Sequence, residues 1–285
     1  MTWRLSIEHI TSYEYEGEVL ASYNEARMSP ARDATQTVLE HRVDVRPNVP
    51  VMAHVDYWGT DVRAFDLHEP HDRLIVAARS LVETAPASSG STSSGSTDIQ
   101  WEELLDANVR DQFYEYLHPS PHVPIDASIR DIAADVSRGR TPSETLDAVG
   151  TWVREHLAYE AGATDVSTNA RSALDLGRGV CQDFVHVALS LLRAAGIPAR
   201  YASGYLHPDA DAPLDDAVTG QSHAWLEAWA GSWRRNDPTS GSAVGEQHVL
   251  VARGRDYSDV TPLKGVYNGP PSRSSEVRVT IRRVA

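Results

Sequence analysis

The sequence predicts an α+β protein, in which an N-terminal antiparallel β domain precedes a core of helices packed on an antiparallel sheet. Three observations support this prediction. The first 85 or so residues show the period-2 alternation of strands, helical periodicity begins after residue 100, and strand patterns return after residue 198. An apolar content of 41% in 285 residues is enough for a sizeable core.

The N-terminal strands are indicated by apolar residues at every second position. Trp3, Leu5 and Ile7 alternate with polar neighbours, and residues 42–45 repeat the pattern. Further apolar runs over residues 51–57, 61–65 and 73–82 are separated by turn signals. We therefore expect residues 1–85 to form a β-sandwich-like domain.

A change in composition marks the predicted domain boundary. Residues 86–97 read PASSGSTSSGST and contain no large side chain that could be buried. Residues 86–100 are therefore predicted to be a flexible linker, and residues 101–285 to form the second domain.

The second domain begins with helical patterns. Helices are expected over residues 101–117, 126–136, 142–157 and 180–195; the third opens with the capping box Thr141-Pro142-Ser143-Glu144. Strands are expected over residues 199–206, 223–229 and 233–237. The tail alternates again at Val277, Val279 and Ile281, which predicts a last strand that completes a sheet in either domain.

Composition also limits the possible partners and the compartment. A formal net charge of -14 argues against a nucleic-acid partner and against an anionic membrane surface. We find no signal-peptide pattern and no apolar run long enough to span a bilayer, and one cysteine excludes an internal disulfide. A cytoplasmic location is therefore expected, and no cofactor, no metal site and no particular oligomeric state is predicted.

Cys181 is the first candidate for chemistry. It follows Gly177-Arg178-Gly179-Val180 at the start of a predicted helix. The unpaired N–H groups and partial positive charge of a helix start favour a thiolate, and the Cys181 N–H is a donor for an oxyanion. Gly179 leaves room for a substrate backbone, and Gln182 is a second candidate oxyanion donor.

A thiolate that transfers acyl groups needs a proton carrier and a group that orients it. Of the 12 histidines, His223 opens a predicted strand, His223-Ala224-Trp225-Leu226-Glu227-Ala228-Trp229. Asp237 ends the next short strand, so two antiparallel neighbours can place its carboxylate beside the imidazole.

These motifs together resemble the transglutaminase-like superfamily. The similar segments are ALDLGRGVCQDFVHVALSLLRAAGIPARYASGYL, SHAWLEAW and NDPTSG, within residues 140–245. The first 85 residues and the segment RGRDYSDVTPLKGVYNG are similar to those of bacterial members. The resemblance implies a papain-like core with Cys181 as nucleophile, His223 as general acid/base and Asp237 as the orienting carboxylate. Asn236 departs from the apolar residue usual before the aspartate, which predicts wetter surroundings for Asp237.

The predicted activity is acyl transfer from an amide bond of a peptide or protein, through a thioester. Tyr205 and Trp225 are candidates for an acyl pocket, although core packing explains either equally well, and the resemblance implies that Tyr257 closes over the cleft. Water or an amine can resolve the thioester, with a slight preference for water. The alternatives are a catalytically silent binding module on the same fold and a peptide-assembly factor that binds extended chains along a strand edge.

Overall fold

The computed structural model describes residues 2–86 and 99–285. Residues 87–98, which make up most of the predicted linker, lie outside the described residues. The strands are β1 (Trp3–Val19), β2 (Ala21–Ala26), β3 (Gln36–Arg46), β4 (Met52–Val55), β5 (Asp61–Leu67), β6 (His71–Thr84), β7 (Ala158–Tyr159), β8 (Arg178–Gly179), β9 (Ala199–Leu206), β10 (Val218–Trp229), β11 (Trp233–Asn236), β12 (His248–Gly254), β13 (Leu263–Asn268) and β14 (Ser272–Arg283).

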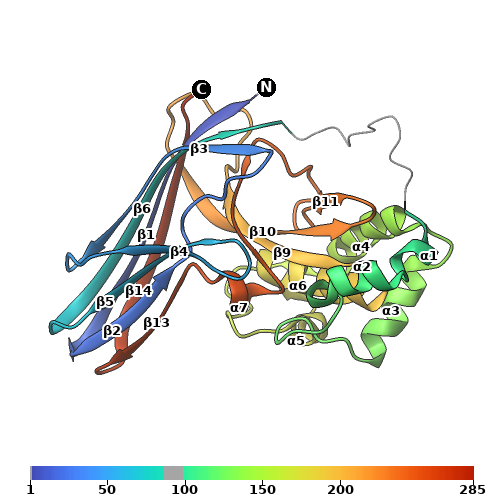
Figure 1. Cartoon of the computed structure of the whole chain (residues 1–285), viewed down its shortest axis with the longest axis horizontal. Helices are drawn as coiled ribbons and strands as arrows, with labels where there is room; N and C mark the ends of the chain where they lie inside the picture. Colours follow the sequence, from blue (N-terminus) through green and yellow to red (C-terminus); the bar gives the residue numbers. More distant parts are fainter. Residues whose placement is uncertain (1, 87–98) are drawn as a thin grey trace.

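The helices lie between β6 and β13 in the chain. They are α1 (Trp101–Leu104), α2 (Ala107–Gln112), the 3₁₀ turn η1 (Tyr114–Tyr116), α3 (Ala127–Ser137), α4 (Pro142–His156), α5 (Ala170–Leu176), α6 (Cys181–Ala194) and α7 (Tyr257–Val260). The predicted α+β class is confirmed, with helices gathered on one side of long antiparallel strands (Figure 1). Among the described residues, no helix combines the length and the apolar character needed to cross a membrane.

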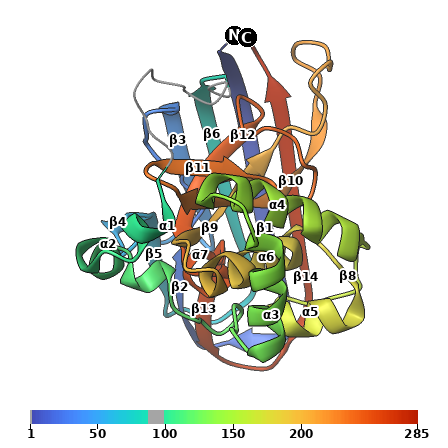
Figure 2. The ribbon, with the colours of Figure 1, turned by 90° about the vertical axis from the view of Figure 1, so that its right-hand side faces the viewer.

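One large sheet runs through both predicted domains. Within the described residues it has the order β12-β9-β10-β14-β1-β6-β3, with β11 also paired to β10. The last strand, β14, pairs with β1 over most of its length and with β10 over the short segment Val218–Gly220. The C-terminal strand therefore completes the sheet of the N-terminal region and joins it to the strand that carries His223. The two chain ends lie side by side as a result (Figure 2).

The long strand β1 contributes to two hydrophobic cores. Its first part buries alternate side chains, and Leu5 and Ile7 belong to the same core cluster as the buried face of α6. Its last part, with Tyr15 and Val19, packs in a second core formed with the smaller sheet β13-β2-β5-β4. Of the three apolar residues expected on one face of β14, Val279 and Ile281 are buried but Val277 is 60% exposed.

Helix α6 is the centre of the second part of the chain. Its residues from Gln182 to Arg193 are all buried, and it packs on β10 and against α3, α4 and α5. The predicted capping box of α4 is confirmed: the Thr141 hydroxyl accepts the Glu144 N–H, and the Glu144 carboxylate accepts the Thr141 N–H.

The prediction of one helix over residues 101–117 is wrong. The chain forms α1, α2 and η1 in succession. Asp106 explains the break, because its side chain accepts the Asn108 N–H at 2.8 Å and starts α2 as an N-cap. An aspartate in the interior of a helical pattern competes in this way with continuation of the helix.

Candidate active site

Cys181 is the first residue of α6, and the turn before it is built around Asp183. The Asp183 carboxylate accepts the Val180 N–H at 2.8 Å and the Thr164 hydroxyl at 2.6 Å. Gly179 makes room for this carboxylate, since a Cβ there would lie 2.5 Å from an Asp183 oxygen. The N–H groups of Cys181 and Gln182 have no acceptor within the helix, and the Cys181 side chain is partly exposed.

His223 lies on β10 between Cys181 and Asp237. Its Nε2 donates to Asp237 Oδ2 at 2.9 Å, and its ring also hydrogen-bonds the Cys181 side chain. Burial alone would lower the pKa of His223, but the hydrogen bonds to Asp237 and Cys181 outweigh it and raise the pKa to about 9. The imidazole is therefore protonated at neutral pH.

Asp237 follows β11, which pairs with β10 as predicted, with Leu226 opposite Asn236. The Asp237 side chain is fully buried, so the wetter surroundings expected from Asn236 are not found. Asn236 instead packs over α4, where Gly150 has no Cβ to obstruct it. Burial would raise the pKa of Asp237, but hydrogen bonds, above all from His223, hold it far below its usual range.

Comparison with known proteins places the chain in a family. The transglutaminase-like superfamily profile matches residues 130–238, and the profile of the bacterial transglutaminase-like N-terminal region matches residues 5–83. An uncharacterised protein of Mycobacterium leprae is 42% identical over 99% of this chain and 100% of its own length.

The chain belongs to the transglutaminase-like superfamily. An uncharacterised protein of Mycobacterium tuberculosis is 31% identical, covering 93% of this chain and 88% of its own. A candidate cysteine protease from Cytophaga hutchinsonii has the same fold, with a TM-score of 0.76 at 21% identity over 98% of this chain and 90% of that one. The transglutaminase-like fold expected from the sequence is thus confirmed.

The transglutaminase-like core brings three tyrosines close to Cys181. Burial raises the pKa of Tyr159 and of Tyr201, and negative charge at Cys181 raises each further. Tyr257, at the start of α7, is affected in the same way by burial, Tyr13 and Cys181. Tyr257 was expected at the cleft, whereas Tyr159 and Tyr201 carry no sequence signal that sets them apart from core residues.

Other predicted contacts of the substrate point elsewhere. The Gln182 amide donates to the Val166 carbonyl at 3.4 Å, so it has a partner within the protein. Tyr205 is buried, and its hydroxyl bonds His9 Nδ1 on β1 at 2.9 Å. Trp225 is 1% exposed and packs in a small cluster with Ala202 and Leu250 on β9 and β12. The structure therefore places Tyr205 and Trp225 in the core.

Two neighbours of Asp237 were not predicted. The Ser240 hydroxyl donates to Asp237 Oδ2 at 2.6 Å, while the Thr239 and Ser240 N–H groups donate to Oδ1 at 2.9 and 3.3 Å. His248, the first residue of β12, has its Nε2 3.9 Å from the same Oδ2. A serine three residues after an aspartate in a Pro-Thr-Ser run is a turn signal that would have located Ser240. No local signal identifies His248.

His223, Asp237 and His248 present three ligand atoms within 4.8 Å of one another, a spacing that a metal ion can use. Their hydrogen bonds do not fit a metal. A histidine ligand binds through one nitrogen and donates a proton from the other, but His248 Nδ1 accepts the Gly245 N–H at 3.3 Å, so its proton is on Nε2. The His223 Nε2 also carries a proton, which it donates to Asp237. The cluster is a set of donors around one carboxylate.

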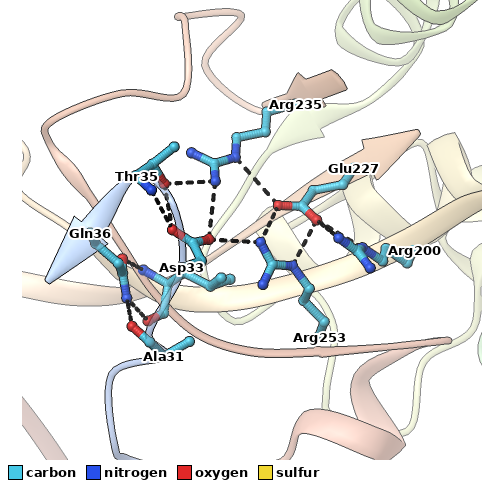
Figure 3. A network of polar contacts seen from close by, with 9 residues as sticks. Ala31, Asp33, Thr35, Gln36, Arg200, Glu227, Arg235 and Arg253 are labelled. Carbon is cyan, nitrogen blue, oxygen red and sulfur yellow. Dashed lines mark hydrogen bonds and ion pairs between the residues drawn. The ribbon is translucent and has the colours of Figure 1, made fainter. Parts of the chain in front are cut away.

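A buried ion network holds the strand of His223 against the N-terminal region (Figure 3). Glu227 on β10 is 1% exposed and accepts from Arg200 at 2.8 Å and from Arg253 at 2.7 Å, and it also pairs with Arg235. Asp33, before β3, bonds Arg253 at 2.9 Å and Arg235 at 3.3 Å. Burial would raise the pKa of Glu227, but the arginines, Arg253 foremost, lower it to about 2.

The same N-terminal segment is also bound to β12. Gln36 donates to the Leu250 carbonyl and accepts the Leu250 N–H, both at 2.8 Å, and the Ala31 N–H donates to the same carbonyl at 2.8 Å. Leu250 lies two residues after His248 on the strand. Residues 31–36 therefore hold β12 directly and β10 through the ion network, and these strands carry His248 and His223.

Proposed function

We propose that this protein is a cysteine-dependent enzyme that transfers an acyl group from an amide bond of a peptide or protein substrate. The observation that carries the proposal is a buried His223 in hydrogen-bond contact with both Cys181 and Asp237, contacts that raise its pKa to about 9. In this arrangement the imidazolium favours a thiolate, and the carboxylate holds the ring in position.

The proposed reaction begins with attack of the Cys181 sulfur on the amide carbonyl carbon, which forms a C–S bond and an oxyanion. The Cys181 N–H at the helix start stabilises this oxyanion. When the intermediate collapses, the C–N bond breaks, His223 gives its proton to the departing nitrogen, and a thioester remains. Water or an amine then attacks the thioester, His223 takes the proton of that nucleophile, and the C–S bond breaks to release Cys181 as a thiolate.

We propose water as the acceptor. Transfer to an amine requires that water be kept away from the thioester, whereas the Cys181 side chain is partly exposed here. We also propose a cytoplasmic location, because the one cysteine of the chain would serve as a reduced thiol. The net charge of -14 favours peptides over nucleic acids as partners.

The test uses purified wild-type protein and the Cys181→Ala variant with a peptide library and glutamine-containing peptides. Turnover should disappear in the variant, and a free carboxylic acid should form even when a primary amine is present. An amide product with the amine would assign the acceptor as an amine instead. Equal turnover by the wild type and the variant would contradict the proposal.

A binding module with an inert thiol is distinguished by alkylation. Because Cys181 is the one cysteine of the chain, incorporation of iodoacetamide reports this residue alone. Rapid labelling at about pH 6.5, where an ordinary thiol is almost entirely protonated, supports the enzyme. A rate no higher than that of a free cysteine at the same pH supports the binding module.

A further inference from the structure

His248 is a buried histidine for which the proposed reaction has no role. It is 6% exposed, and its Nε2 lies 3.9 Å from Asp237 Oδ2, which is too long for a hydrogen bond. Among the described residues this Nε2 has no hydrogen-bond partner. A buried donor without a partner is costly, and this one points at the most strongly hydrogen-bonded carboxylate of the site.

The turn before β12 determines which nitrogen of His248 carries the proton. The His248 N–H donates to the Gly245 carbonyl at 2.9 Å, and the Gly245 N–H donates to His248 Nδ1 at 3.3 Å. Since Nδ1 accepts a hydrogen bond, it carries a lone pair and no proton. The proton of the neutral ring is therefore on Nε2. The positive end of this N–H bond therefore faces Asp237.

The surroundings keep His248 neutral and limit how the ring can move. Burial lowers the pKa of His248, and the charges of His223 and Arg235 lower it further, against the opposing effect of Asp237. The ring stands edge-on to Trp225, with centroids 5.3 Å apart and planes at 81°. His248 is thus a neutral donor kept near Asp237 without a second positive charge that would compete with His223.

Catalysis changes the charge balance at this point. While His223 is an imidazolium, Asp237 is paired with a full positive charge and accepts the Ser240 hydroxyl as well. When His223 gives the proton on its other ring nitrogen to the leaving nitrogen, Asp237 keeps the Nε2–H of a neutral ring but loses the positive charge, so a further donor stabilises the carboxylate more than before. A modest movement of the His248 ring would convert the 3.9 Å approach into a hydrogen bond.

We propose that His248 is a positioning residue that holds Asp237 in place behind His223 and hydrogen-bonds its carboxylate when His223 releases its proton. This inference rests on the proposed function for its catalytic part. The position of His248 behind Asp237 does not depend on which amide is cleaved or on whether water or an amine accepts the acyl group.

The experiment compares His248→Met with His248→Gln. The two side chains have nearly the same length, but only glutamine offers an N–H near the place of Nε2. His248→Met should lower kcat about tenfold, which is the effect of losing one weak hydrogen bond to a charged group, with little change in KM. His248→Gln should restore most of that loss.

The pH dependence of Cys181 alkylation gives a second readout that needs no substrate. In the wild type the rate should change near pH 9, where His223 loses its proton. Without a donor at residue 248 the carboxylate holds the His223 proton more tightly. The change in His248→Met should therefore move upward by roughly half a pH unit, a threefold change in proton affinity, and His248→Gln should stay near the wild type.

His207→Leu is the matched control, because His207 is also a buried histidine close to His248. Its backbone N–H donates to the carbonyl of Gln247, the residue before His248. It should leave kcat and the alkylation profile unchanged. Equal losses in His248→Met and His248→Gln, or an unmoved profile in His248→Met, would overturn the role of His248. If no substrate is turned over by the wild type, the proposed function fails, while the alkylation profiles still decide the role of His248.

Discussion

The pairing of His223 with Asp237 and Cys181 makes the stability of the fold depend on pH in a defined direction. The pKa of His223 rises from an ordinary 6.5 to about 9 on folding. At about 1.4 kcal/mol per unit, this difference of about 2.5 units corresponds to about 3 kcal/mol. Because the ring is 8% exposed, solvent screening reduces this value little.

The sign follows from the proton bound on folding. A raised pKa means that the folded state binds the proton more tightly, so the stabilisation is complete below pH 6.5 and is lost as the pH rises through about 9. In urea unfolding, the wild type should exceed His223→Gln in free energy of unfolding by about 3 kcal/mol more at pH 6 than at pH 10.

Cys181→Ala provides the control for this measurement. It removes one of the two partners that raise the pKa of His223, so the pH-dependent difference should shrink but keep its sign, because Asp237 remains. A difference between wild type and His223→Gln that is equal at both pH values would refute the reasoning. A difference that grows with pH would show that burial, and not pairing, dominates at His223.

Two further substitutions test the support of the site. Glu227→Gln should lower the free energy of unfolding in urea by about 3–5 kcal/mol, because three guanidinium groups lose a buried anion. Glu160→Gln, which breaks an exposed ion pair, is the control and should lower it by less than about 1 kcal/mol. The Glu227 contribution should also disappear as the pH falls from 4.5 to about 2. Gly204→Ala should destabilise the folded protein by more than about 2 kcal/mol and lower turnover, because a Cβ there would lie 1.9 Å from the Val249 carbonyl oxygen. Thermal unfolding measures this loss. The control is Gly17→Ala, whose Cβ would have its nearest contact at 3.4 Å.

Local patterns in the sequence predicted the elements whose causes are local. The alternation at Trp3, Leu5 and Ile7 is the buried face of β1, and the box at Thr141 starts α4. The glycine-rich segment before Cys181 predicted a helix start at this residue, and α6 begins there. In each case the residues that determine the structure lie within a few positions of one another.

The features that were missed depend on contacts between distant parts of the chain. The pairing of β10 with β14 involves only three residues on β10, too few for an alternation to be recognised. His248 reaches Asp237 because β12 lies beside β9 in the sheet, which no spacing in the sequence reveals. The sequence cannot distinguish Tyr205 from a tyrosine that lines a substrate pocket. Only the hydrogen bond between its hydroxyl and His9, which is distant in the chain, shows that it belongs to the core.

The position of β14 between β1 and β10 has a consequence for biosynthesis. Until the ribosome has released the C-terminal strand, β1 has one unpaired edge, and the strand that carries His223 lacks its strand pairing with the N-terminal sheet. An unpaired edge of this length is a site for wrong association between nascent chains. A chain cut short before β14 is therefore expected to associate with other chains through this exposed edge of β1.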